Sequence, residues 1–332
     1  MITTRRALII YGPTATGKTD LALNLAKKFN GELISTDSRQ VYKGLDIGTG
    51  KVSFGSKVEK HQGFWVVNGI KIHGFDLVNP DEQFTAADFL KSAVTSVIQI
   101  TEEKKLPIMV GGSGFYIKTL INGLGSIGIP ADQKLRRKLE KLSTEELFEK
   151  LKSVNLQKAE SLNASDSKNS RRLIRAIEIA LSNQKLNIKN QNENLKLMYS
   201  QGLKSKIENY LLVGLIAPNQ YLYGRADKWL KIRIEKGLID EVKRLINQQV
   251  DQKWLDDLGL EYRWLTRYLM GQISKEEAIE RLRGDIHGFI RRQKTWFRQF
   301  PDLPAGRQVH LFDISTKNWR RQLENQVTLW HV

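Results

Sequence analysis

One eight-residue segment limits the fold more than any other part of the chain. It matches the phosphate-binding pattern G-x-x-x-x-G-K-[ST] in full, reading Gly12-Pro13-Thr14-Ala15-Thr16-Gly17-Lys18-Thr19. An apolar run without alternation, residues 7–11, precedes the segment as a buried parallel strand would, and residues 19–28 follow with helical spacing. The backbone amides of such a loop point inward at phosphate oxygens, aided by the positive end of the helix. The segment therefore predicts a bound phosphate or diphosphate.

Two side chains of this loop add chemistry of their own. Lys18 supplies a positive charge to the anion, and the hydroxyl of Thr19 suits a Mg²⁺ ion that bridges phosphate oxygens. We therefore expect Mg²⁺ as the cofactor, inferred from Thr19 and the anion rather than from a set of visible ligands. The five histidines are scattered and none lies at metal-ligand spacing. The absence of cysteine excludes disulfides, thiolate catalysis and Cys-ligated zinc.

Further apolar runs alternate with helical patterns along the chain. Residues 33–36, 106–110 and 211–216 resemble buried strands, and residues 88–100 have helical periodicity. Strands that alternate with helices predict an α/β fold built on a parallel sheet. After residue 216 we expect helices only, apart from a turn-rich loop over residues 301–308.

The middle of the chain differs from both flanks. Residues 126–200 are highly charged and helical in pattern, with a candidate capping box at Ser143–Glu146 and a polar loop expected over 183–206. Because a buried strand returns at 211–216, this stretch reads as an insertion into the α/β domain. We predict one domain over residues 1–125 and 201–332, and a helical insertion domain over 126–200.

A second loop is predicted beside the phosphate loop. Asp37 ends the strand at 33–36, and the glycines Gly111, Gly112 and Gly114 follow the strand at 106–110. Ligands of open α/β sheets gather at the carboxyl ends of the strands, so these loops are expected to share one crevice. The residue pattern leaves Asp37 open as a metal ligand, a general base or an ordinary loop cap.

Charge points toward a polyanionic partner. The formal net charge is +17, of which +4 lies in residues 1–120 and +13 in residues 121–332. Such a field favours nucleic acid over a membrane surface, although a basic surface that only aids solubility is an equal reading of charge alone. No apolar run reaches the roughly 18 residues of a membrane helix, and the first residues leave no room for a signal peptide. We expect a cytoplasmic protein.

The motifs together resemble those of the tRNA dimethylallyltransferases, also called tRNA isopentenyltransferases. The family's loop G-P-T-A-[ST]-G-K-[ST] is Gly12–Thr19, and its long D-S-R-Q-V-Y-x-G-x-D-I-G-T-x-K stretch is Asp37–Lys51 without a break. Its V-G-G-[TS]-G-x-Y segment is Val110–Tyr116, and its R-R-Q-x-T-W-F-R segment is Arg291–Arg298. The resemblance runs from about residue 7 to 300 in the family's order. It implies a P-loop kinase-like core with a helical insertion that grips the anticodon stem-loop of tRNA.

The resemblance also implies a reaction and its residues. Members transfer a dimethylallyl group from dimethylallyl diphosphate to the exocyclic amine of the adenosine just 3′ of the anticodon, and diphosphate leaves. The implied catalytic residues are Asp37 as general base, Thr19 with Mg²⁺, and Arg225 on the diphosphate. The implied tRNA-contacting residues are Asp37, Ser38, Arg39, Gln40, Ser113, Arg136, Arg171, Arg172, Arg175, Arg291 and Arg292. For the segment Arg171–Arg175, the residue pattern alone slightly favours a solvated basic face over contact with RNA. The resemblance to the family favours contact with RNA instead.

Some positions depart from the family's pattern. Trp229 stands where a second arginine usually follows Arg225, His73-Gly74 replaces a His-His pair, and Leu260-Glu261 interrupts a G-Y-[KR]-[EQ] turn. Other readings are an adenylate isopentenyltransferase acting on free nucleotide, a small-molecule P-loop kinase, and an RNA-binding protein with a decayed site. The basic insertion argues against the first, the Asp37–Lys51 stretch against the second, and intact Lys18, Thr19 and Asp37 against the third. We expect a monomer.

Overall fold

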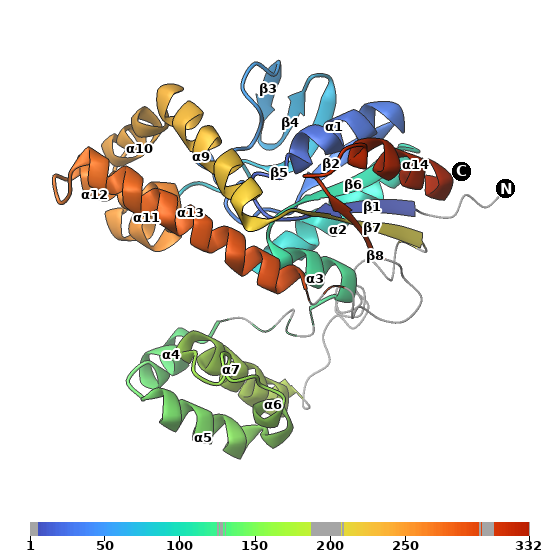
Figure 1. Cartoon of the computed structure of the whole chain (residues 1–332). Coiled ribbons are helices and arrows are strands. Elements are labelled where there is room, and N and C mark those ends of the chain that lie inside the picture. The colour runs from blue at the N-terminus through green and yellow to red at the C-terminus, as the bar shows by residue number, and fades with distance from the viewer. Residues whose placement is uncertain are drawn as a thin grey trace. The chain divides into compact units, whose positions relative to one another are not determined.

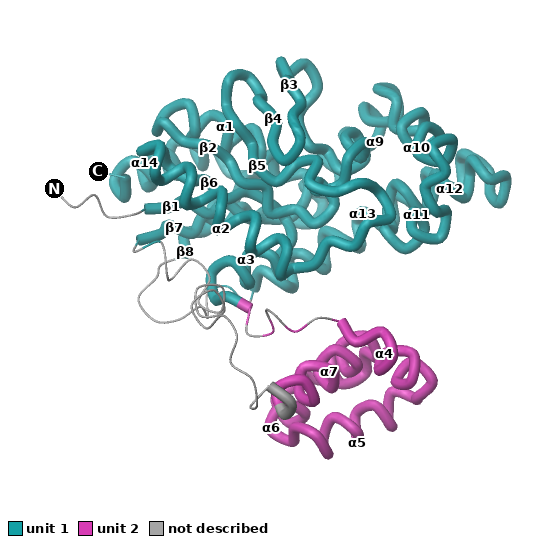
Figure 2. The backbone as a smooth tube through the Cα atoms, turned by 180° about the vertical axis from the view of Figure 1, so that it is seen from behind, with its two compact units in different colours: residues 1–123, 202–332 teal, residues 124–201 magenta. Residues whose placement is uncertain are grey.

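The chain forms two compact units. A computed structural model describes residues 6–124, 126, 129, 131–186, 207, 209–298, 300 and 309–331. The first unit comprises residues 1–123 with 202–332, and the second comprises residues 124–201 (Figure 2). The insertion predicted at residues 126–200 differs from the second unit by two residues at its start and one at its end.

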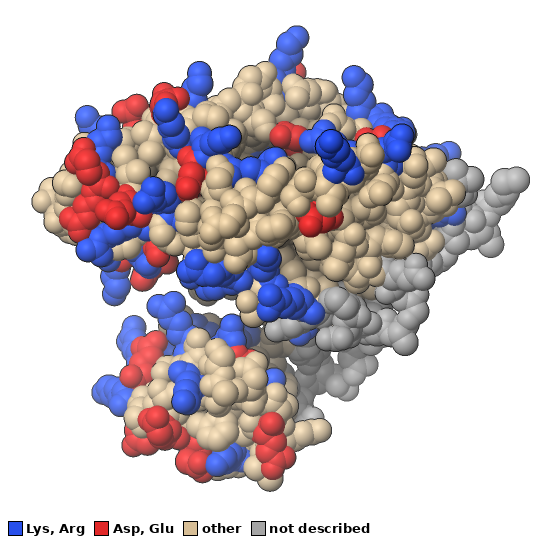
Figure 3. Space-filling model, viewed as in Figure 1, with Lys and Arg blue, Asp and Glu red and all other residues tan. Residues whose placement is uncertain are grey.

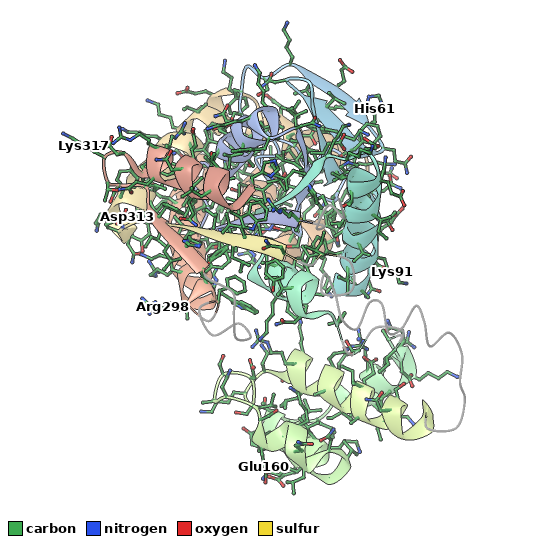
Figure 4. The ribbon with its side chains drawn as sticks, turned by 90° about the vertical axis from the view of Figure 1, so that its right-hand side faces the viewer. His61, Lys91, Glu160, Arg298, Asp313 and Lys317 are labelled. Carbon is green, nitrogen blue, oxygen red and sulfur yellow. The ribbon has the colours of Figure 1, made fainter. Side chains whose placement is uncertain are left out.

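An eight-stranded sheet organises the first unit. Its order is β3-β4-β5-β2-β6-β1-β7-β8, and the six strands from β5 to β8 in that order are parallel. The strands are β1 (Arg6–Tyr11), β2 (Gly31–Ser35), β3 (Val58–His61), β4 (Gly63–Val67), β5 (Ile70–Phe75), β6 (Leu106–Gly111), β7 (Asn209–Ile216) and β8 (Val309–Asp313). Figure 4 labels His61 and Asp313, which belong to the strands at the two edges of the sheet. The central strands β1, β2 and β6 are buried almost throughout, as their continuous apolar runs predict.

Helices cover the sheet and continue beyond it (Figure 1). They are α1 (Lys18–Lys28), α2 (Ala86–Glu102), α3 (Gly114–Asn122), α9 (Asn219–Glu235), α10 (Leu238–Asn247), α11 (Gln252–Leu258), α12 (Leu260–Leu269), α13 (Lys275–Phe297) and α14 (Trp319–His331). The α2 helix begins with a capping box in which Thr85 and Asp88 satisfy each other's backbone amides. Within the described residues, no helix is both long and apolar enough to cross a membrane.

The second unit is a small helical body with its own core. It contains α4 (Gln133–Leu139), α5 (Thr144–Val154), α6 (Leu156–Glu160) and α7 (Ser170–Leu186). The predicted capping box at Ser143 is present and starts α5. The buried side chains of its core are Leu139, Leu147, Leu151, Ala159, Leu173, Ile174 and Ile177. These are the positions that helical periodicity places on inward faces.

The fold extends one expectation and corrects another. The predicted parallel sheet is present, and β3 and β4 extend it by pairing antiparallel with each other and with β5. The chain after residue 216 is not all helical, because β8 pairs in parallel with β7. The two edge strands, β3 and β8, are partly exposed and lack the continuous apolar run of a central strand. Of the predicted polar loop 183–206, α7 takes the first residues up to Leu186, and the remainder lies outside the described residues, as does the loop 301–308.

Candidate functional site

The phosphate loop connects β1 to α1 and has the conformation that its glycines allow. Gly17 adopts a left-handed φ of 80° directly before the helix, and Ala15 has a φ of 65°. A Cβ atom on Gly12 would lie 2.6 Å from the carbonyl oxygen of Leu215 on β7. Glycine is therefore required at Gly12 by close backbone approach and at Gly17 by its dihedral angle.

The lysine of this loop is held by neutral partners. Lys18 Nζ donates to the carbonyl oxygen of Pro13 at 2.7 Å and contacts the hydroxyl oxygen of Thr16 at 3.4 Å, while Thr16 donates to the same carbonyl at 2.9 Å. Burial lowers the pKa of Lys18 to about 8, against the opposing effect of the negative charge of Asp37. An anion beside Lys18 would favour the charged ammonium form.

The loops predicted to meet do share one cavity. It measures about 850 Å³, lies wholly within the first unit, and is lined by residues from the ends of β1, β2 and β6. Of the predicted site residues, the cavity is lined by Thr14, Ala15, Gly17, Lys18, Thr19, Asp37, Ser38, Arg39, Gln40, Ser113, Arg225 and Arg292. The shared crevice thus follows from strand ends meeting at one edge of a parallel sheet.

Asp37 is the second residue beyond β2. Its Oδ1 accepts a hydrogen bond from the backbone amide of Arg39 at 3.0 Å, so the side chain does cap its own loop. It also lines the cavity with Lys18 and Thr19. This cap uses only Oδ1 of the carboxylate, so Oδ2 can still take part in a reaction or bind a metal. The geometry is therefore compatible with a loop cap that also accepts a proton or binds a metal.

The residues beside Asp37 are held firmly by their surroundings. The backbone amide of Ser38 donates to Ser113 Oγ at 3.1 Å. Arg39 lies 3.7 Å from a carboxylate oxygen of Glu261 and 5.2 Å above the ring of Phe289. The buried amide of Gln40 donates to the carbonyl oxygens of residues 49 and 50 and contacts Ser35 Oγ. These contacts fix the loop that follows β2 against the rest of the cavity.

Arg225 reaches the phosphate loop from the opposite wall. It lies on α9, and its Nε donates to the carbonyl oxygen of Ala15 at 2.7 Å. Trp229, one turn further along α9, also lines the cavity and packs against Phe54 with ring centroids 5.2 Å apart. Lys228 joins them in the lining. The α9 helix thus presents cations and an aromatic ring to the same cavity.

Arg291 and Arg292 differ in their placement on α13. Arg291 donates to the hydroxyl of Tyr223 at 3.0 Å on the outer side, and Arg292 lines the cavity. Figure 3 shows Lys and Arg side chains gathered along the C-terminal part of α13, while Asp and Glu gather where α10 to α12 lie. Arg298, at the end of α13, is labelled in Figure 4.

The predicted arginines of the second unit are largely engaged in ion pairs. Arg136 contacts both carboxylate oxygens of Glu178, at 3.0 and 2.9 Å, and Arg175 pairs with the same carboxylate. Burial raises the pKa of Glu178, but hydrogen bonds from the two arginines outweigh that effect. The pKa therefore lies below its usual value. Arg172 pairs with Asp166, and Arg171 is exposed.

Two residues that the sequence analysis did not single out hold the site together. The buried carboxylate of Glu241 accepts the backbone amides of residues 46, 47 and 48 at 2.7–3.0 Å, together with the hydroxyl of Tyr262. The buried amide of Gln293 bonds to the phosphate loop and to the glycine turn after β6. A carboxylate among the apolar positions of α10 was a signal for Glu241. Gln293 lies in the R-R-Q-x-T-W-F-R segment, which marks the residue but not its contact with a loop 279 residues away.

The possible metal donors are few. Thr19 and Asp37 line the cavity with oxygen atoms, which is the ligand type that Mg²⁺ takes. No cluster of three or more His, Cys, Asp or Glu suited to a metal occurs within the described part of the chain. Mg²⁺ usually keeps several waters and uses one or two protein groups with substrate phosphates, so these residues fit it.

Comparison with known proteins agrees with this geometry. The sequence model of the IPP transferase family matches residues 40–300. A tRNA dimethylallyltransferase of Acetivibrio thermocellus is 37% identical over 300 residues, covering 89% of this chain and 90% of the relative. A tRNA dimethylallyltransferase 1 of Geotalea daltonii is 36% identical, covering 92% of this chain and 90% of the relative. The solved tRNA isopentenylpyrophosphate transferase of Bacillus halodurans superposes with a TM-score of 0.66 at 30% identity, covering 98% and 97%.

Proposed function

The chain belongs to the IPP transferase family, and from that premise we propose that it is a tRNA dimethylallyltransferase. In this reaction the dimethylallyl group moves from dimethylallyl diphosphate to the exocyclic N6 amine of the adenosine 3′ to the anticodon. The observation that supports it best is the single cavity lined by the phosphate loop, Asp37 and Arg225. That cavity has room for a diphosphate and a reacting amine beside each other.

The leaving group is the proposed ligand of the phosphate loop. The bond between the allylic carbon and the diphosphate oxygen breaks, and its electron pair stays on the diphosphate. Loop amides, Lys18 and Arg225 are proposed to surround the place where that charge grows. Among the described residues, the two cations hydrogen-bond to backbone carbonyls of the loop and, for Lys18, to the Thr16 hydroxyl. Cations aimed at developing charge lower the barrier most when they need no rearrangement.

The amine must lose a proton as the new carbon–nitrogen bond forms. Asp37 lines the same cavity, and we assign it as the general base that accepts this proton. Its bond to the amide of Arg39 holds the carboxylate in place. Mg²⁺, when bound, would neutralise diphosphate oxygens, and Thr19 with the diphosphate is the proposed holder.

The acceptor is proposed to be the anticodon stem-loop of tRNA. A base within a stacked loop must turn out of the stack before its amine can react, and cations and aromatic rings assist this. The proposed contacts are Ser38, Arg39, Gln40, Ser113, Arg291 and Arg292 in the first unit, and Arg136, Arg171, Arg172 and Arg175 in the second. We propose that the second unit grips the stem-loop, and that the enzyme works as a monomer in the cytoplasm.

A transfer assay tests this proposal directly. The protein is incubated with labelled dimethylallyl diphosphate, Mg²⁺ and either unmodified tRNA or AMP, and the nucleosides are then separated. We expect label in the adenosine of tRNA alone. Label in AMP alone would move the protein to the free-nucleotide enzymes, and no label in either would call for a kinase screen with ATP.

Two variants of Asp37 separate its roles in that assay. Asp37→Ala removes both the base and the loop cap, whereas Asp37→Asn keeps an oxygen for the amide of Arg39 and removes only the base. We expect either change to lower turnover on the order of 10²–10⁴-fold while tRNA binding stays nearly intact. An active Asp37→Asn variant beside an inactive Asp37→Ala variant would show that Asp37 acts as a loop cap only.

A further inference from the structure

The buried amide of Gln293 makes contacts that the proposed reaction has not yet used. Gln293 lies near the C-terminal end of α13 and is 6% exposed. Its Oε1 accepts the backbone amide of Thr14 at 2.9 Å, and its Nε2 donates to the carbonyl oxygen of Gly112 at 3.0 Å. A backbone donor on one side and a backbone acceptor on the other determine which way the amide points.

These two bonds join the two loops that line the cavity. Thr14 belongs to the phosphate loop, and Gly112 belongs to the turn that follows β6. The next residue, Ser113, accepts the amide of Ser38 beside Asp37. A continuous series of hydrogen bonds and adjoining backbone therefore runs from the phosphate loop through Gln293 to the loop of the proposed base.

The space around Gln293 is matched to its side chain. A Cβ atom on Gly112 would lie 2.5 Å from Nε2 of Gln293, so only glycine at that position leaves the amide in place. The α13 helix has other anchors here, because Phe297 packs on Tyr11, the last residue of β1, with ring centroids 5.0 Å apart. Trp296 fills the space beside Gly114, where a Cβ atom would lie 2.8 Å from its ring. The packing of α13 therefore does not depend on Gln293. Its hydrogen bonds instead fix the position of the phosphate loop relative to the turn after β6.

We propose that Gln293 is a positioning residue that sets the phosphate loop for diphosphate and fixes its distance from the Asp37 loop. This inference rests on the proposed function, in which the loop binds the diphosphate of the donor. Since the amide of Thr14 is used by Gln293, the remaining amides of the loop are the ones left for phosphate oxygens. Removal of the side-chain amide would free Thr14 and Gly112 to move. The loop amides would then be less well oriented toward the diphosphate.

The test measures the affinity of inorganic pyrophosphate and of tRNA separately on the full chain. Gln293→Met keeps the length of the side chain and removes both hydrogen bonds. Gln293→Glu keeps an acceptor for the Thr14 amide but replaces the donor to Gly112 with a negative charge. We expect pyrophosphate binding to weaken about tenfold in Gln293→Met and more in Gln293→Glu, with tRNA affinity unchanged.

Two further variants keep the test decisive. Gly112→Ala places a methyl group against Nε2 of Gln293 and displaces the amide without changing Gln293 itself. We expect it to weaken pyrophosphate binding in the same way as Gln293→Met. It therefore provides a test if Gln293→Met fails to fold. Gln322→Met makes the same chemical change at an exposed position of α14 and is expected to bind pyrophosphate like the wild type.

The outcomes distinguish this inference from the proposed function. A folded Gln293→Met variant with wild-type pyrophosphate affinity overturns the inference, and so does an equal loss of tRNA affinity, which would indicate a general structural role. If Gln293→Met does not fold, unchanged affinity in Gly112→Ala overturns it. A wild-type protein that binds pyrophosphate and transfers no prenyl group contradicts the proposed function instead, and leaves the role of Gln293 in the loop standing.

Discussion

Cations at the cavity and cations in the insertion have different partners. At the cavity, Lys18 and Arg225 bond to carbonyl oxygens of the phosphate loop. In the second unit, Arg136 and Arg175 share the carboxylate of Glu178, which is 2% exposed. No carboxylate pairs with the first two cations among the described residues, whereas much of the charge of the second pair is neutralised by Glu178.

The difference separates charge that attracts a ligand from charge that holds a fold. A carbonyl partner orients a cation and leaves its net charge, so an arriving diphosphate meets an oriented positive site. A carboxylate partner removes most of that field and adds a bidentate contact between helices α4 and α7. Residue type and helical position alone did not distinguish the two groups of cations.

Lys18→Met gives the largest expected effect on the cavity side of this comparison. We expect kcat/KM for prenyl transfer to fall on the order of 10²–10³-fold, because one oriented cation on the leaving diphosphate is lost. Pyrophosphate titration and single-turnover transfer would measure it. Near-normal transfer by this variant would mean that the phosphate loop does not bind the leaving group.

Glu178→Ala tests the insertion side. It leaves Arg136 and Arg175 without their shared carboxylate, and we expect the second unit to lose about 3 kcal/mol of stability. The loss is not larger because both arginines are partly exposed and water can solvate them. Hydrogen exchange of residues 131–183 in the full chain would report the loss. Glu149→Ala is the matched control, because Glu149 is 68% exposed and its pair with Lys152 adds little. An unchanged exchange rate would contradict a structural role for Glu178.

A pH series sharpens the cavity side. The pKa of Lys18 is lowered to about 8 by burial, so the ammonium that attracts diphosphate is progressively lost as pH rises through 8. Pyrophosphate affinity is therefore expected to be constant well below pH 8 and to fall by up to about tenfold per pH unit above it. Titration in two buffers of different ionisation enthalpy should show proton uptake on binding. A flat profile between pH 7 and 9.5 would remove Lys18 from the binding site.

Arg171→Gln gives the smallest effect. Arg171 is exposed, and no ion pair to a carboxylate involves it among the residues that the structure describes. If it contacts a tRNA phosphate, its loss reduces the slope of log affinity against log salt by about 1. Arg136→Gln should instead lower the stability of the second unit. Equal salt slopes for the wild type and Arg171→Gln would assign Arg171 to the solvated surface.

Much of the cavity could be predicted because its signals are local. The phosphate loop needs glycines at set positions between a buried strand and a helix, and central parallel strands are continuous apolar runs. The edge strands β3 and β8 were missed because partly exposed strands lack that run. The inner strands β4 and β5 were missed as well. Glu178 was not singled out either, because an isolated acid on α7 gives no sign of the arginine on α4 that it pairs with.

The sequence by itself determined the phosphate loop, the alternating α/β order, the helical insertion and the family resemblance, because each depends on residues close together in the chain. Tertiary structure decided which polar groups meet. It brought Gln293 to Thr14 across 279 positions, Arg225 to Ala15 across 210, and Glu241 to the loop at residues 46–48. Such contacts depend on how helices pack against sheet edges, and a buried polar side chain finds its partner only when the chain has closed around it.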